Sequence, residues 1–113
     1  MASVQPQKSA LGPAPVGAVS LVEYQPGAIV SRQLLKNAQA NLTLFAFDQG
    51  QELSEHTSVF NALVLVLEGQ ARITVAGRSH SVGAGRMVLM PAGQPHAVKA
   101  TKRFKMLLTL VRP

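Results

Sequence analysis

The chain has 113 residues, enough for one domain with a real core and too few for several domains. Apolar residues make up 47% of it and charged residues 14%, which excludes a disordered chain. It contains no cysteine, which excludes disulfides, thiolate metal sites and cysteine nucleophiles.

The formal net charge of +6 raises the possibility of nucleic-acid binding, but the cations are spread along the chain. The one basic cluster is Lys99, Lys102, Arg103 and Lys105, with the single aromatic Phe104 turned away by strand alternation. No nucleic-acid-binding motif accompanies it. We therefore expect a solvated basic edge and no nucleic-acid partner; attraction of an anionic ligand or partner is the alternative.

Residues 1–15 hold three prolines and little periodicity. They predict a flexible N-terminal arm, or an extended segment that adds to an edge strand. They contain no signal-type apolar run, and no part of the chain has the roughly 20 apolar residues that would span a bilayer. We expect a cytoplasmic protein with no membrane partner.

Residues 16–113 predict a single domain of short strands separated by turns. Val/Leu-rich or alternating runs place these strands at residues 19–24, 28–35, 42–47, 63–67, 71–76, 79–82, 87–90, 96–100 and 104–111. The best helical candidate, residues 31–40, is weakened by the adjacent Val30. About nine or ten strands at this spacing indicate an all-β sandwich or barrel.

Two segments carry a more specific pattern. The first places Gly50, His56, Ser58, Ala62 and Gly69 at intervals that leave five, one, three and six residues between them. The second places Gly85, Pro91, Gly93, His96 and Ala100 with five, one, two and three residues between them. Together they resemble the two motifs of the cupin superfamily. The resemblance implies a double-stranded β-helix, that is, a jelly-roll-like barrel.

The chain departs from the cupin pattern at the positions that would bind metal. Metal-binding cupins have His, His and Glu in the first motif and His in the second. Here His56 and His96 are kept, whereas Ser58 and Ala62 replace the second His and the Glu. A serine hydroxyl is a poor ligand for a transition metal and alanine is none, so two imidazoles alone should bind one divalent ion (Zn, Fe, Mn or Ni) weakly.

Two further side chains could complete such a metal site. Glu52 lies four residues before His56, the right parity for the same face of a strand, and Gln94 precedes His96 with a carbonyl oxygen to offer.

The leading hypothesis is a small-organic-ligand pocket at His56 and His96. Its remaining members would be Ser58, Ala62, Phe60 and Met106. The alternative is a divalent-metal-dependent enzyme of the dioxygenase, isomerase or decarboxylase type. Metal-free acid–base catalysis, with a histidine oriented by Glu52, and a structural or regulatory role are also open. Cupins of this size commonly pair, so the resemblance implies a homodimer.

Overall fold

A computed structural model describes residues 4–7 and 11–113 of the chain. This part of the chain holds eight strands and one short 3-10 helix. They are β1 (Val4–Gln7), η1 (Ala18–Leu21), β2 (Ile29–Lys36), β3 (Ala40–Phe47), β4 (Glu52–His56), β5 (Asn61–Val75), β6 (Arg78–Gly83), β7 (Met87–Met90) and β8 (His96–Val111). The predicted all-β class is confirmed. None of the described residues belong to a helix long and apolar enough to cross a membrane.

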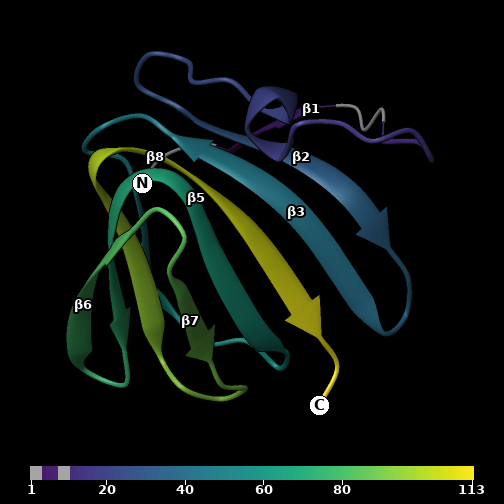
Figure 1. The fold of residues 1–113 in the computed structure, drawn as a ribbon. Helices are drawn as coiled ribbons and strands as arrows, with labels where there is room; N and C mark the ends of the chain where they lie inside the picture. The colour runs from purple at the N-terminus through teal and green to yellow at the C-terminus, as the bar shows by residue number, and fades with distance from the viewer. Residues whose placement is uncertain (1–3, 8–10) are drawn as a thin grey trace.

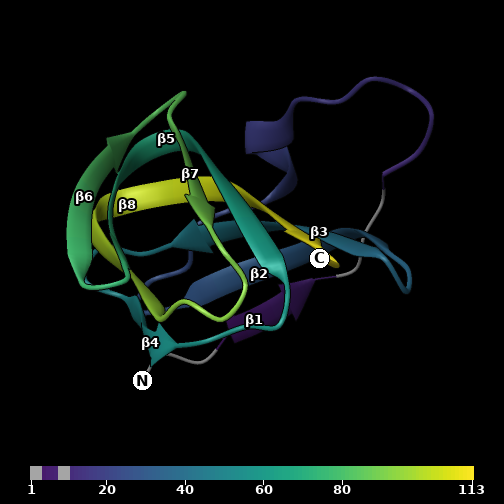
Figure 2. The same ribbon diagram turned by 90° about the horizontal axis from the view of Figure 1, so that it is seen from below.

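Two long neighbouring strands, β5 and β8, organise the barrel (Figure 1). The first half of β5 pairs with β7 and its second half with β6. Likewise, β8 pairs with β4 near its start and with β3 along its end. Because each long strand changes partner midway, the two strands curve around a common interior, as Figure 2 shows from below. The sheet continues from β3 through β2 to β1, which runs parallel to β2 at the edge.

Gly69 lies where β5 crosses close to β8. Its φ of +78° belongs to the left-handed region, and the register between β5 and β8 shifts on both sides of it. A Cβ at this position would lie 1.8 Å from the backbone oxygen of Arg103. Only glycine satisfies both constraints, so Gly69 supplies the bulge that bends β5 without ending it.

Two pairs of predicted strands each form one continuous strand. Residues 63–67 and 71–76 belong to β5, and residues 96–100 and 104–111 belong to β8. The glycine between the first pair is the bulge just described, and the polar residues between the second pair form an exposed corner of β8. Residues 19–24 form no strand, whereas β1 and β4 were not among the nine predicted runs, so the described residues hold eight strands where nine or ten were predicted.

The prediction of a strand at residues 19–24 is wrong. Residues up to Leu21 form η1, where the backbone N–H and the hydroxyl of Ser20 both donate to the carbonyl of Gly17, at 3.1 and 2.8 Å. The weak helical candidate at residues 31–40 is also wrong, since it covers most of β2, a turn and the start of β3. In that turn the Asn37 side chain accepts hydrogen bonds from the backbone of Gln39 and Ala40.

The predicted N-terminal arm includes β1, which pairs with Ile29 to Arg32 of β2 as an added edge strand would. Residues 1–3 and 8–10 of the arm lie outside the described part of the chain.

The core has two clusters, one on each side of the curved sheet. The inner cluster fills the barrel, where Phe47 and Phe104 stack with ring centroids 4.5 Å apart. The outer cluster buries Val22 against Leu44 and its neighbours on the outer face. The segment around η1 thus covers part of the sheet from outside and leaves the interior to the barrel strands.

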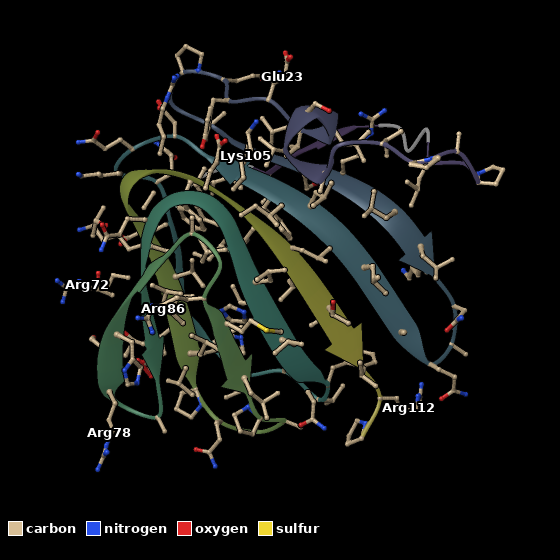
Figure 3. All side chains as sticks on the ribbon, in the orientation of Figure 1. Glu23, Arg72, Arg78, Arg86, Lys105 and Arg112 are labelled. Carbon is tan, nitrogen blue, oxygen red and sulfur yellow. The ribbon has the colours of Figure 1, made fainter. Side chains whose placement is uncertain are left out.

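Three members of the predicted solvated basic edge, Lys99, Lys102 and Arg103, are exposed, but Lys105 is buried and corrects the prediction. It is only 7% exposed, and its ammonium group donates to the carbonyl of Val19 at 2.7 Å. Glu68 lies 3.8 Å away and the Tyr24 ring 5.0 Å away. Lys105 therefore ties the η1 segment to β8, whereas the labelled arginines in Figure 3 are exposed and scattered over the surface.

The role of Gly69 gives a test of the fold. We expect Gly69→Ala to lower the free energy of unfolding by at least about 3 kcal/mol, because the added methyl overlaps backbone and the φ is unfavourable. Gly83→Ala is the matched control, since a Cβ there meets nothing within 4 Å. The control should change stability by less than about 0.5 kcal/mol in urea unfolding. Equal effects of the two substitutions would contradict the assignment of Gly69 as an obligatory bulge.

Candidate functional site

The two motif histidines are brought together by the pairing of β4 with β8. His56, the last residue of β4, is the register partner of His96, the first residue of β8. The rings meet edge to face, with centroids 4.3 Å apart. His96 is only 5% exposed, whereas His56 is exposed, so the pair lies at the mouth of the barrel with one ring inside it. Residues 40 positions apart in sequence thus form one unit.

Backbone carbonyls determine which nitrogen of each ring is free. His56 Nδ1 lies 2.7 Å from the carbonyl oxygen of Ser54, and His96 Nδ1 lies 3.1 Å from that of Gln94. A carbonyl oxygen can only accept, so each Nδ1 carries the proton and donates it. In a neutral imidazole the other nitrogen then has a lone pair. Both Nε2 atoms are therefore acceptors when the rings are neutral.

The two Nε2 atoms face one another at 3.1 Å. Two neutral rings would set lone pair against lone pair at this distance, which is repulsive. The contact becomes favourable when the two nitrogens share one proton, or when a bound molecule beside the pair donates hydrogen bonds to both lone pairs. The mouth of the barrel therefore presents two hydrogen-bond acceptors, the Nε2 atoms of His56 and His96, which a hydrogen-bond donor would stabilise.

A cavity of about 220 Å³ adjoins the histidine pair. Aliphatic side chains and methionines make up most of its wall, and the polar lining residues are His96 and the consecutive residues His56, Thr57 and Ser58. The lining residues are Leu53, His56, Thr57, Ser58, Ala62, Met90, His96, Val98, Met106, Leu108 and Leu110. The cavity holds the volume of about seven waters at roughly 30 Å³ each, which suits a small molecule rather than a drug-sized one.

Most of the predicted pocket residues line this cavity. Ser58, Ala62 and Met106 do so together with the histidine pair, and Ala62 and Met106 are buried. Phe60 does not appear in the wall. Its backbone N–H instead donates to the Ser58 hydroxyl oxygen at 3.0 Å, which holds that side chain in place.

The structure separates Glu52 from the histidine pair. The register between β4 and β8 shifts by one residue between Leu53 and His56, so the alternation on which the shared face of Glu52 and His56 was predicted is broken. Leu53 faces the cavity instead, while Glu52 is exposed and lines an outer groove with Arg72 and Lys99. The expectation that Glu52 shares a face with His56 is wrong because of this bulge.

Gln94 contributes to the site through its backbone. Its carbonyl orients His96, and its side chain is exposed and does not line the cavity. The carbonyl of Ser54 plays the same part for His56.

Sequence reasoning missed more than half of the cavity wall. The residues that were not predicted are Leu53, Thr57, Met90, Val98, Leu108 and Leu110. Three of these lie on β8 at even-numbered positions, as do His96 and Met106. Alternation from His96 reaches Val98, and alternation from Met106 reaches Leu108 and Leu110, so this pattern is the sequence signal that could have found them.

The two histidines supply only part of a divalent-metal site. The two histidines resemble metal ligands, since such imidazoles commonly donate their second N–H to a carbonyl. Yet catalytic zinc sites use three protein ligands, and the described part of the chain holds no group of three or more His, Cys, Asp or Glu placed for a metal ion. The donor set therefore does not fit a resident catalytic metal.

Burial lowers the pKa of His96 below that of an ordinary imidazole. The hydrogen bond to the Gln94 carbonyl opposes this shift, and the nearby charge of protonated His56 lowers the pKa of His96 further. Neutral His96 is therefore favoured near pH 7.

Comparison with known proteins places these features in context. Residues 43–111, more than half of the chain, match the family described as the cupin domain. A conserved protein of unknown function from Streptococcus pyogenes has 34% identity and a TM-score of 0.87, over 91% of this chain and 90% of that one. A cupin superfamily protein from Desulfitobacterium hafniense has 27% identity and a TM-score of 0.86, over 91% and 94% of the two chains.

A cupin 2 conserved barrel domain protein from Leptotrichia buccalis is 40% identical over 82% of this chain and 45% of that one, with a TM-score of 0.80. No curated protein matched the sequence.

The lowered pKa of His96 predicts a specific pH dependence of stability. The stabilising effect of neutral His96 is fully present above about pH 6.5, the ordinary imidazole pKa, and is lost as pH falls through its folded-state pKa, because the unfolded chain binds the proton more readily. Urea unfolding between pH 8 and pH 5 should show a steeper loss of stability for the native protein than for His96→Gln. His80→Gln, at an exposed histidine, is the control and should follow the native curve. Identical curves for His96→Gln and the native protein would contradict the assignment.

Proposed function

This chain belongs to the cupin family, and on that premise we propose that its barrel binds a small organic molecule in the cavity that ends at His56 and His96. The observation that supports this proposal most directly is the lining of the cavity. Most of its wall consists of aliphatic and methionine side chains, and its polar lining residues are His96 and the consecutive residues His56, Thr57 and Ser58. Pockets of this kind hold an apolar body by its shape and one polar end by hydrogen bonds.

The volume limits the size of the ligand. A cavity of about 150 Å³ is known to accommodate benzene, and drug-sized molecules need about 300 Å³ or more. At about 220 Å³ the present cavity lies between these sizes. Replacing glutamate with Ala62 contributes to this space, because the small, buried alanine leaves room where a charged side chain would stand. The ligand is therefore a short aliphatic molecule with one polar group.

A divalent-metal-dependent enzyme is the second candidate. The observation in its favour is the converging pair of Nε2 atoms, each on a ring that is oriented by a carbonyl. Against it stands the missing third ligand, since Glu52 lies in the outer groove and the Gln94 side chain is outside the cavity.

Metal content separates the two candidates. Elemental analysis of protein purified without a histidine tag should find well below one metal ion per chain, both for the native protein and for the His56→Ala, His96→Ala double variant. Near-stoichiometric metal that the double variant loses would put the metalloenzyme first.

Metal-free acid–base catalysis has less support. It requires a group that orients the proton-carrying histidine, and the predicted carboxylate of Glu52 is not at the pair. The carbonyls of Ser54 and Gln94 orient the rings instead, and a neutral carbonyl stabilises an imidazolium less than a carboxylate would. The homodimer expected from the family resemblance stays a prediction.

Filling the cavity tests the proposed function. Leu108→Phe places a larger side chain in the cavity wall, while Thr109→Phe adds similar bulk at the neighbouring residue, which does not line the cavity. We expect a fragment library screened by ligand-observed NMR to give hits with the native protein that Thr109→Phe keeps and Leu108→Phe loses. Hits that persist in Leu108→Phe would show that binding occurs elsewhere. A native protein with no hits would contradict a ligand-binding role.

A further inference from the structure

We propose that the ligand of this cavity carries a primary carboxamide at its polar end. This inference rests on the proposed function and adds the chemical class of the head group. It follows from the juxtaposition of two acceptor nitrogens with the hydroxyl groups of Ser58 and Thr57 in the lining of a cavity that holds no carboxylate or ammonium group.

The histidine pair can only accept hydrogen bonds from a ligand when both rings are neutral. With both Nδ1 atoms engaged by the carbonyls of Ser54 and Gln94, the two Nε2 atoms offer lone pairs 3.1 Å apart. A primary amide has an NH2 group with two N–H donors on one atom, and this number matches the two acceptors. A carboxylate has only acceptors and would set oxygen lone pairs against nitrogen lone pairs.

Ser58 offers a hydrogen-bond donor to the same ligand. Its hydroxyl oxygen accepts a hydrogen bond from the backbone N–H of Phe60 at 3.0 Å, which fixes the oxygen and leaves the hydroxyl hydrogen for donation. Ser58 lines the same cavity as the two histidines. A carboxamide places its carbonyl acceptor next to its NH2 donors, so one head group satisfies both kinds of partner.

The wall of the cavity disfavours a charged head. Apart from the two histidines, none of its lining residues is ionisable at neutral pH. An ammonium or carboxylate taken from water into this wall would have no countercharge, and an unpaired buried ion is far costlier than a hydrogen-bonded neutral amide. A primary alcohol avoids this cost but offers only one donor to two acceptors. The amide is thus favoured over its charged and hydroxylic counterparts.

The test compares four probe molecules that have five-carbon chains and differ in their polar head group. The probes are pentanamide, pentanoate, pentylammonium and pentan-1-ol, with chelator-treated native protein at pH 8, above the ordinary imidazole pKa of about 6.5. Binding is followed by NMR of 13C-methyl methionine, because Met90 and Met106 line the cavity while Met87 is 57% exposed and does not. We expect pentanamide to bind at least about tenfold more tightly than pentanoate, which is nearly identical in size, with shifts at Met90 and Met106 and little at Met87.

Variants assign the preference to the named groups. His56→Ala removes one acceptor and should weaken pentanamide binding about fivefold or more. His80→Ala, at an exposed histidine that does not line the cavity, should leave it unchanged. Ser58→Ala should weaken pentanamide binding more than pentylammonium binding, because only the amide has a carbonyl to accept from the hydroxyl.

The possible outcomes separate this inference from the proposed function. Tighter binding of pentanoate, pentylammonium or pentan-1-ol at Met90 and Met106 would overturn the carboxamide and leave the cavity as a ligand site. Failure of all four probes to shift Met90 or Met106 would count against the ligand site itself, and the carboxamide would fall with it.

Discussion

Two backbone carbonyls decide the chemistry of this barrel. The oxygens of Ser54 and Gln94 accept the Nδ1 protons of His56 and His96 and thereby turn both Nε2 atoms toward one another. If either ring carried its proton on Nε2 instead of Nδ1, its N–H would point at the partner and the pair would offer one donor and one acceptor. The carbonyl of Ser54 is placed by the bulge in β4, and that of Gln94 by the turn that leads into β8. The polar end of the cavity is therefore set by backbone geometry.

The apolar part of the cavity depends on the same strands. β8 begins at His96 and carries every second side chain into the interior, so one strand supplies the inner histidine and much of the aliphatic wall. β5 can follow its curve because Gly69 lets the two backbones approach closely. Lys105, on the outer side of β8, holds the η1 segment against the sheet. The inner face of β8 thus lines the cavity, while its outer face anchors the η1 segment and stabilises the fold.

Much of this architecture can be predicted from the sequence. The all-β class and the meeting of His56 with His96 follow from alternation and motif spacing, because both depend on local pattern and on the known pairing of the motif strands. Two kinds of feature escape such reasoning. A bulge has no sequence signature beyond an occasional glycine, so Glu52 could not be placed outside the cavity and Gly69 was mistaken for a strand end. The orienting carbonyls are invisible in sequence because every residue has one. The Phe60 ring, by contrast, was placed in the pocket on residue type alone.

The tautomers of the two histidines test the central claim most directly. A long-range 1H–15N correlation spectrum of metal-free protein at pH 8 distinguishes a ring protonated at Nδ1 from one protonated at Nε2. The structure predicts the Nδ1–H form for both His56 and His96, with His80 as an internal comparison from an exposed site. An Nε2–H form at either His56 or His96 would contradict the converging acceptor pair and, with it, the account of what this cavity binds.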